Sequence, residues 1–219
     1  MESYKPTDRS RVHRHAERAK YDTATVHAIL DSSSFAHVGI VQNGQPLVIP
    51  MGYARAGEVL YLHGSPGSRL LRQIAEGVDV CVTVTLLDGM VFARSVFNHS
   101  MNYGSAVVFG KGRLVDELEE KKRAMFAFTE QLIPGRWDEA RTPSENELKG
   151  TTFIAVDIID ASAKMRTGPV IDDDVDLVTP IWGGVVPLTM VAGEPNPDSH
   201  NSAGSAVPAS IEAFRRRHR

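Results

Sequence analysis

Tight turns between short β-rich segments constrain the fold of this 219-residue chain more than any other feature. Residues 35–41 and 46–54 flank Asn43-Gly44, the strongest short-range signal for a two-residue hairpin. A further turn leads from the second segment into a third, residues 59–63. Strands joined this closely are antiparallel neighbours, because a parallel connection needs a long crossover. The sequence therefore predicts a three-stranded antiparallel meander.

More β-rich segments follow the meander. We predict strands at residues 78–87, 90–97, 103–115 and 151–160, with Asp88-Gly89 as the turn between the first two. Gly110 and Gly112 are expected to kink the third of these, as a curling sheet requires. Pro50 cannot donate to a strand ladder, so its strand is expected to have an edge, a bulge or an opening there. Six or seven such strands predict a mainly β antiparallel barrel with helices around it.

Helix signals lie between the strands. Val26, Ile29 and Leu30 are spaced to share one face of a short helix that begins after Asp22. Residues 68–76 and 119–132 are predicted as two further helices, and Ser144 begins a short one with Glu147 at capping-box spacing.

A polar loop joins the third meander strand to the helix that follows it. The stretch Leu60–Ile74 reads as a strand, the loop Gly64–Ser68 and a helix that carries Arg69 in its first turn. Unpaired N–H groups at a helix start, with hydroxyls and a guanidinium beside them, can hold a phosphate. The alternative is an ordinary strand-to-helix turn in which Ser68 caps the helix.

Composition excludes several classes of protein. A net charge of -3 gives no electrostatic reason to expect a nucleic-acid or membrane partner. The single cysteine, Cys81, precludes an intrachain disulfide and is expected to be a small buried side chain. The first residues hold no apolar segment for secretion or membrane spanning, so a cytoplasmic location is expected. No cluster of metal ligands stands out, since His13 and His15 lack acidic or thiol partners.

The sequence also suggests three regions. Residues 1–21 are basic and lack a hydrophobic period, so we expect a solvated arm. Residues 22–192 hold the barrel segments and form the expected domain. Residues 193–219 are rich in Pro, Asn, Ser and Gly before a basic end, which is typical of a flexible tail.

The order of these parts resembles a known family. A strand ending in His63-Gly64-Ser65, the Ser68-Arg69 helix start, the strand VTVTLLDG and a Tyr-x-Ser-x-Val-x-Phe-Gly strand follow one another. This order is similar to that of the pyridoxamine 5′-phosphate oxidase-like FMN-binding split barrels, in the flavin-nucleotide-binding branch with the nitroimidazole-resistance proteins. The resemblance implies a six- to seven-stranded antiparallel split barrel flanked by helices. It also implies a homodimer with FMN at the subunit interface.

The resemblance implies a set of cofactor contacts. Ser65, Ser68 and Arg69 would hold the FMN phosphate, while backbone groups at Pro50 and Met51 would bind the imide edge of the flavin. Thr83 and Thr85 would offer hydroxyls to the ribityl chain or phosphate, with plain β-propensity as the alternative.

Further contacts would complete the site. Tyr103 and Ser105 would reach the partner's cofactor, although Gly104 stands where a larger residue is usual. Lys164 would stabilise reduced anionic FMN or be an exposed lysine. Trp182 would shield the flavin ring or fill the core.

His63 is the one candidate catalytic residue. An imidazole that titrates near neutral pH can orient or protonate a substrate, and the alternative is a hydrogen bond at the dimer interface. The implied activity is an FMN-dependent oxidoreductase acting on a small molecule, with NAD(P)H as a candidate electron donor. The alternatives are a non-catalytic flavin-binding sensor or carrier, and a barrel that uses deazaflavin or haem instead. Pyridoxamine phosphate oxidation itself is not expected, because the basic end IEAFRRRHR follows a spacer expected to be disordered and so does not match the Arg-rich substrate-binding segment of that enzyme.

Overall fold

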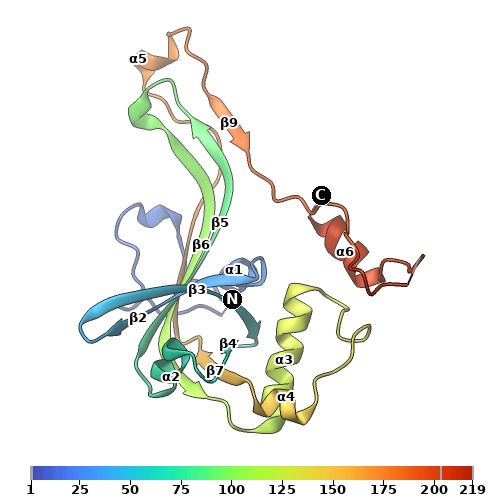
Figure 1. The fold of residues 1–219 in the computed structure, drawn as a ribbon. Helices are drawn as coiled ribbons and strands as arrows, with labels where there is room; N and C mark the ends of the chain where they lie inside the picture. Colours follow the sequence, from blue (N-terminus) through green and yellow to red (C-terminus); the bar gives the residue numbers. More distant parts are fainter. Residues whose placement is uncertain (1, 203, 219) are drawn as a thin grey trace.

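Nine strands form the sheet of the computed structural model, which describes residues 2–202 and 204–218 (Figure 1). The strands are β1 (Ala19–Lys20), β2 (Phe35–Gln42), β3 (Gln45–Ala56), β4 (Val59–Gly64), β5 (Asp79–Phe92), β6 (Ser100–Leu114), β7 (Thr152–Asp157), β8 (Asp160–Arg166) and β9 (Gly184–Pro187). The helices are α1 (Thr23–Asp31), α2 (Arg69–Ala75), α3 (Leu118–Leu132), α4 (Glu145–Lys149), α5 (Asp174–Leu177) and α6 (Ala209–Arg217), with 3₁₀ turns at Ala16–Arg18 and Val96–Asn98.

Six of the strands close a ring in the order β6-β7-β4-β3-β2-β5 and back to β6. Every pair is antiparallel, and β8 and β9 extend the sheet beyond the ring from β6 and β5. The ring is split because β3 pairs with β2 along its first part and with β4 only from Tyr53 to Ala56. The predicted split antiparallel barrel, and its opening three-stranded meander, are therefore confirmed. Asn43 and Gly44 have φ values of 50° and 76°, as the predicted hairpin turn requires.

The ring closes where β6 changes partner at Gly112. β6 pairs with β5 up to Lys111 and with β7 from Gly112 to Leu114. A Cβ atom at Gly112 would lie 2.1 Å from Ile74 Cγ2 and 2.8 Å from Ile154 Cγ2. The predicted kink is thus a place where strand β6 passes directly against α2, and only glycine leaves room for that approach.

The interior of the ring is filled by aliphatic side chains, and α1 and α2 contribute to it. Asp22 caps α1 by accepting from Thr25 N at 2.8 Å, and Val26, Ile29 and Leu30 are buried as the spacing predicts. The same cluster contains Leu70, Leu71 and Ile74 of α2, the helix between β4 and β5.

A second cluster lies outside the ring, under α3. It combines Tyr61 of β4 and Phe153 of β7 with Ala124 and Phe128 of α3. The predicted helix at residues 119–132 is confirmed, as is the capping box of Ser144 and Glu147 on α4. The outer surface of β4 and β7 is therefore covered by a helix.

One predicted turn and one predicted strand are wrong. Asp88-Gly89 does not reverse the chain, because β5 continues to Phe92 through a bulge between Leu87 and Gly89. The glycine is needed for packing, since a Cβ there would lie 3.0 Å from Val186 O of β9. The reversal comes at the Val96–Asn98 turn, so β5 and β6 form a long arm beyond the barrel (Figure 1). Conversely, the strand expected at residues 151–160 is two strands. The chain bends at Ile158, whose N donates to Glu58 O at 2.7 Å.

The N-terminal segment is not the solvated arm that its composition suggests. Tyr4 is buried, and its hydroxyl donates to Glu58 Oε2 at 2.7 Å. Thr7 Oγ1 donates to Asp160 Oδ2 at 2.6 Å, and Ala19–Lys20 pairs with β8. The segment therefore binds across the barrel and adds a strand to it.

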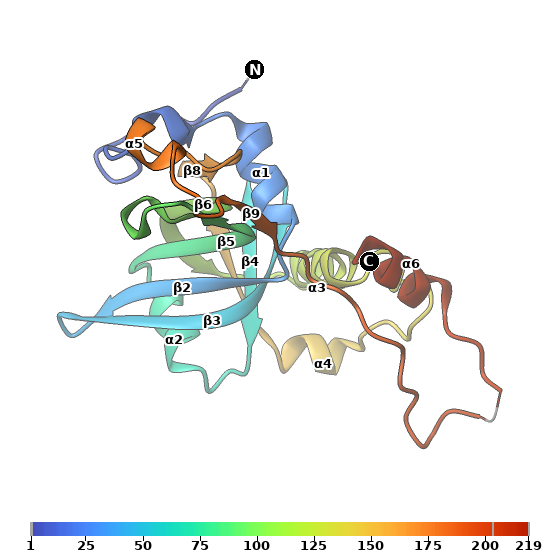
Figure 2. The same ribbon diagram turned by 90° about the horizontal axis from the view of Figure 1, so that it is seen from above.

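The C-terminal segment leaves the barrel after β9 and returns as α6 beside α3 (Figure 2). Ser210 N donates to Glu139 Oε1 at 3.2 Å, and Ala192 N donates to His218 O at 2.8 Å. The structure thus forms a helix at the end of the segment that was expected as a flexible tail. Across the described ranges, none of the helices has the length and apolar character needed to cross a bilayer.

Candidate functional site

One continuous outer face runs across β3, β2, β5, β6 and β8. Directly paired residues of antiparallel strands point to the same side of a sheet. Pro50 pairs with His37, which pairs with Thr83. Thr85 pairs with Ser105, which pairs with Lys164. These residues therefore lie in neighbouring rows of this face, which we call the outer sheet face.

Most of the predicted cofactor contacts share the outer sheet face. Tyr103 joins them through its pairing with Leu87 of β5 and Arg166 of β8. Met51 does not, because it pairs with the buried Ala36 and packs against the interior cluster. Pro50 lies on a stretch of β3 that has β2 on one side and no β4 partner on the other. The predicted open edge at Pro50 is therefore present.

The outer sheet face is unusually apolar for a surface. Its exposed large side chains are Phe35, Val41, Val48, Leu87, Met90, Phe92 and Met101, each at least 37% exposed. Several exposed apolar side chains on one face are typical of a binding surface for protein or ligand. Cys81 also lies here, half-buried and 3.7 Å from Thr83 Oγ1, so the expectation that it is fully buried is wrong.

The Ser65–Arg69 turn has the geometry of a capped helix start. Ser68 Oγ accepts from Leu71 N at 3.4 Å, and Ser65 Oγ accepts from Gly67 N at 3.2 Å. The capping interpretation is therefore confirmed. Arg69 is exposed and, within the described residues, its guanidinium takes part in no hydrogen bond or ion pair. The guanidinium is thus open to an anion while Ser68 serves the helix.

Lys164 and Trp182 have surroundings that the sequence did not indicate. Lys164 Nζ donates to Arg14 O at 2.8 Å, so the N-terminal segment holds this ammonium on the outer sheet face. Ser105 Oγ donates to the Lys164 carbonyl at 3.4 Å. Trp182 is 65% exposed, with its ring centroid 6.2 Å from that of Phe92. The alternative that Trp182 fills the core is therefore wrong.

His63 lies apart from the outer sheet face, on the side of β4 that α3 covers. Its ring meets Phe128 edge-on at a centroid distance of 4.2 Å and stacks on Phe153 at 5.8 Å. Its Nδ1 is buried and has no hydrogen-bond partner among the residues that the structure describes, and burial lowers the pKa of the imidazole. The ring is thus neutral near pH 7 and is positioned by aromatic packing.

Acid should destabilise the protein through His63. The unfolded chain binds a proton at this histidine below about pH 6.5, whereas the folded chain, with its lowered pKa, does so only at lower pH. The free energy of unfolding should therefore fall as pH falls below about 6.5. We expect His63→Phe to reduce this slope in denaturant titrations of the apo-protein from pH 7.5 to 5.5. His200→Gln, which removes an exposed imidazole outside the barrel, should keep the parent slope, and an unchanged slope in His63→Phe would contradict the assignment.

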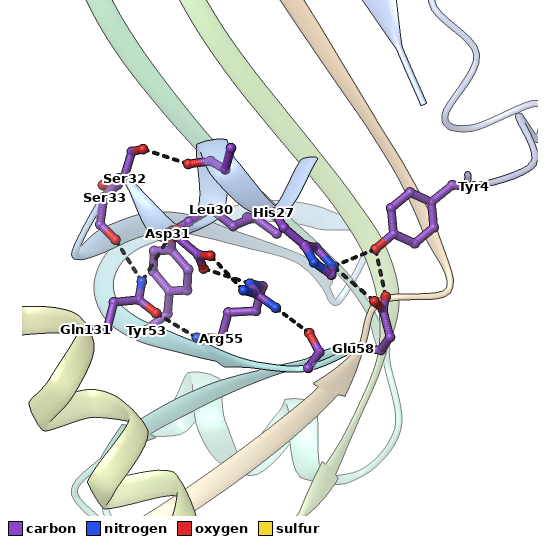
Figure 3. Close-up of polar contacts among 12 residues, drawn as sticks. Tyr4, His27, Leu30, Asp31, Ser32, Ser33, Tyr53, Arg55, Glu58 and Gln131 are labelled. Atoms are coloured by element: carbon purple, nitrogen blue, oxygen red, sulfur yellow. Dashed lines mark hydrogen bonds and ion pairs between the residues drawn. The ribbon is translucent and has the colours of Figure 1, made fainter. Parts of the chain in front are cut away.

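Sequence reasoning missed a polar network between α1, β3 and α3 (Figure 3). Arg55 forms a two-point ion pair with Asp31, at 2.7 Å from Nε and 2.6 Å from Nη2. Gln131 of α3 accepts from Arg55 N at 2.8 Å and donates to Ser33 O at the same distance. His27 Nε2 lies 3.0 Å from Glu58 Oε1 and 3.0 Å from the hydroxyl of Tyr4. These residues are far apart in sequence, so no local pattern could have joined them.

Comparison with known proteins agrees with the split-barrel fold. The sequence model of the pyridoxamine 5′-phosphate oxidase family matches residues 22–165. The flavocytochrome Anf3 from Azotobacter vinelandii is 39% identical, with 97% of this chain and 99% of that chain covered and a TM-score of 0.89. The FAD and heme binding protein from Mycobacterium smegmatis is 36% identical, with 90% and 97% covered and a TM-score of 0.87. No match to a curated protein was found.

A more distant structure supports the fold alone. A protein described as a 5-nitroimidazole antibiotic resistance protein from Bacteroides thetaiotaomicron is 22% identical, with 70% and 95% covered and a TM-score of 0.55. The split ring of strands defines this class of barrel, and the matches place the chain within it. The chain belongs to the pyridoxamine 5′-phosphate oxidase family.

Proposed function

We propose that this chain is a flavoprotein whose flavin lies on the outer sheet face between two copies of the chain. The observation that carries the proposal is the convergence of Thr83, Thr85, Ser105 and Lys164 in adjacent rows of an otherwise apolar exposed face. A flavin needs such a combination, because it has an apolar ring system and a polar ribityl phosphate. We further propose an oxidoreductase that acts on a small molecule, with a bound flavin supplying the electron-transfer chemistry.

The proposed roles follow from the position of each group. The Arg69 guanidinium and the Ser65 hydroxyl would bind the phosphate, and the open edge of β3 at Pro50 would leave its carbonyl free for the flavin. The Lys164 ammonium would favour negative charge on the ring. His63 is a weaker candidate for proton transfer, since α3 and the rings of Phe128 and Phe153 enclose it.

The exposed apolar side chains support a homodimer in this proposal. A two-fold interface uses the same patch on both subunits, so one apolar face suffices to build it. We expect the parent protein to have twice the 23.9 kDa chain mass in light scattering. Met101→Glu, on the outer sheet face, should shift the protein toward the monomer because it would bury a charge. Ile159→Glu, at an exposed turn, should leave the mass unchanged, and a monomeric parent protein would contradict the proposal.

The identity of the flavin can be measured directly. FMN is the flavin implied by the family resemblance, whereas the similar mycobacterial structure is named for FAD. Both carry the phosphate that Arg69 would bind, so the proposed anion site suits either. Purified protein should be yellow, and cofactor released by heat should be identified as FMN or FAD by chromatography. A protein that is colourless and takes up neither flavin would overturn the flavin assignment.

A separate measurement tests whether the protein is an enzyme. Bleaching of the bound flavin by NADH or NADPH, with turnover of an acceptor, would distinguish an oxidoreductase from a sensor or carrier.

Haem is a second candidate cofactor, because two similar structures are named as a flavocytochrome and as a heme-binding protein. Haem iron accepts an imidazole nitrogen as axial ligand. Within the described residues, the imidazole of His37 makes no hydrogen bond and lies exposed beside Phe35. The Nδ1 atom of His63 is also unpartnered there, but Phe128 and Phe153 enclose that ring. His99 fits less well because its Nδ1 accepts from Ala93 N at 3.0 Å, which leaves the proton on Nε2. A Soret band that is lost in His37→Ala or His63→Ala would identify the ligand, and a protein without any Soret band after haem addition would exclude this candidate.

A further inference from the structure

A cavity of about 720 Å³ lies between α3, the end of β3 and the C-terminal end of α6. Its lining consists of Asp31, Arg55, Ala56, Lys122, Arg123, Phe126, Ala127, Glu130, Gln131, Trp137 and Arg217. None of the residues proposed to hold the flavin is among them. The volume lies within the range of small-molecule sites, about 300–1,000 Å³, and most of the lining surface is apolar. The cavity is therefore large enough for a ligand of its own.

Two aromatic rings form one corner of this cavity. Phe126 of α3 and Trp137 meet edge-to-face, with centroids 5.4 Å apart and planes at 77°. Glu130 fixes the loop that carries Trp137, because its carboxylate accepts from Gly135 N at 2.8 Å and from Trp137 N at 3.2 Å. Phe126 is 48% exposed, so the corner is open to a ligand. A flat ring can pack against either aromatic side chain.

The base of the cavity is held by the polar network of Figure 3. Arg55 donates to both Asp31 carboxylate oxygens, and its Nη1 donates to Gly57 O at 2.8 Å. Gln131 is bound on both sides by backbone groups, accepting from Arg55 N at 2.8 Å and donating to Ser33 O at 2.8 Å. The base is thus fixed before a ligand arrives, which lowers the entropic cost of binding.

The cavity has an excess of positive charge. Four cationic side chains line it against two carboxylates. Both carboxylates are engaged, Asp31 by Arg55 and Glu130 by backbone N–H groups. Lys122 is paired with Glu119 at 2.7 Å, whereas Arg123 and Arg217 make no ion pair within the described residues. Two guanidinium groups are thus open to an anion, and guanidinium is suited to bind phosphate and carboxylate.

We propose that this cavity binds a flat aromatic anion of the nucleoside monophosphate class. The ring would pack in the corner of Phe126 and Trp137, and the acidic group would pair with Arg123 and Arg217. The site is built by one copy of the chain and is separate from the outer sheet face. It gives the protein a second ligand site besides the proposed flavin site.

Trp137 offers a local signal for the test, because Trp182 is the only other tryptophan in the sequence. A Trp182→Phe variant would be titrated with adenosine 5′-monophosphate while the emission of Trp137 is followed. We expect saturable quenching. Adenosine, which lacks the charge, and ribose 5-phosphate, which lacks the ring, should each bind at least tenfold more weakly. Equal binding of either fragment and the whole nucleotide, or the absence of saturable quenching, would overturn the proposal.

Matched variants separate this site from the proposed flavin site. In the same background, Arg123→Gln should weaken nucleotide binding about tenfold, as expected for the loss of a charged hydrogen bond. Lys149→Gln removes an equal charge on α4, outside the cavity, and should change nothing. Arg123→Gln should leave flavin uptake intact, whereas Arg69→Ala should leave nucleotide quenching intact. Quenching that depends on Arg69 and not on Arg123 would refute the cavity site, and flavin uptake would test the other proposal independently.

Discussion

Gly112→Ala should destabilise the protein by about 3 kcal/mol or more, near the upper end of the costs of overpacking. The added Cβ would lie 2.1 Å from Ile74 Cγ2 and 2.8 Å from Ile154 Cγ2. Both isoleucines are fully buried in the interior cluster, and Ile74 O at 3.2 Å prevents the new methyl group from moving aside. The main expected effect is a loss of contact between β6 and α2 at the point where the ring closes.

Gly104→Ala is the matched control in the same strand. A Cβ at Gly104 would lie 3.6 Å from Ile29, which is an ordinary van der Waals distance. This substitution should change the free energy of unfolding little, or raise it slightly, because alanine restricts the unfolded chain more than glycine does. Urea unfolding of the two apo-variants at equal protein concentration provides the comparison. Equal stabilities would show that β6 does not pass α2 as closely as the structure indicates.

The parts of the fold that could be predicted from sequence are those that local chemistry determines. Asp22 caps α1 through Thr25, and the buried face of that helix follows from the spacing of its apolar residues. The hairpin turn needs positive φ at Asn43 and Gly44, which those two residues adopt at little cost. Each of these features involves residues within a few positions of one another.

The errors arose where distant residues override a local signal. Asp88-Gly89 has turn composition, yet β9 pairs with β5 across Gly89 and keeps it extended. The alternation of residues 151–160 continues through a bend that the carbonyl of Glu58 fixes. Tyr4 lies in a polar segment but is buried against the network of His27 and Glu58. Single-sequence patterns do not contain these pairings.

The candidate site was predictable only within each strand. Alternation placed Thr83 and Thr85 on one side of a strand, and the structure agrees. It could not show that Thr85, Ser105 and Lys164 lie in one row, because the strand order brings β5, β6 and β8 together out of chain order. Nor could alternation show that α3 encloses His63, since that depends on how the imidazole packs against Phe128 and Phe153.

Loss of the Arg69 side chain should weaken flavin binding by a factor of about 10 to 100. A hydrogen bond between charged groups contributes about 1.5–3 kcal/mol, and a fold-change of ten corresponds to about 1.4 kcal/mol. Arg69 is exposed and, within the described residues, is paired with no carboxylate. Its removal should therefore cost little stability, so the change in affinity would report the lost phosphate contact and not unfolding. Flavin affinity would be measured by fluorescence quenching as flavin is added to apo-protein.

Arg72→Ala is the control that separates a phosphate contact from a general effect of charge. Arg72 is exposed and lies one turn further along α2. Its substitution therefore removes the same charge from the same helix. If Arg69 binds the phosphate directly, Arg69→Ala should weaken FMN binding far more than Arg72→Ala does. Riboflavin lacks the phosphate, so its affinity should respond equally and weakly to both substitutions. If FMN affinity fell equally in both variants, α2 would influence the flavin only through its overall charge, and the phosphate would have to be bound elsewhere.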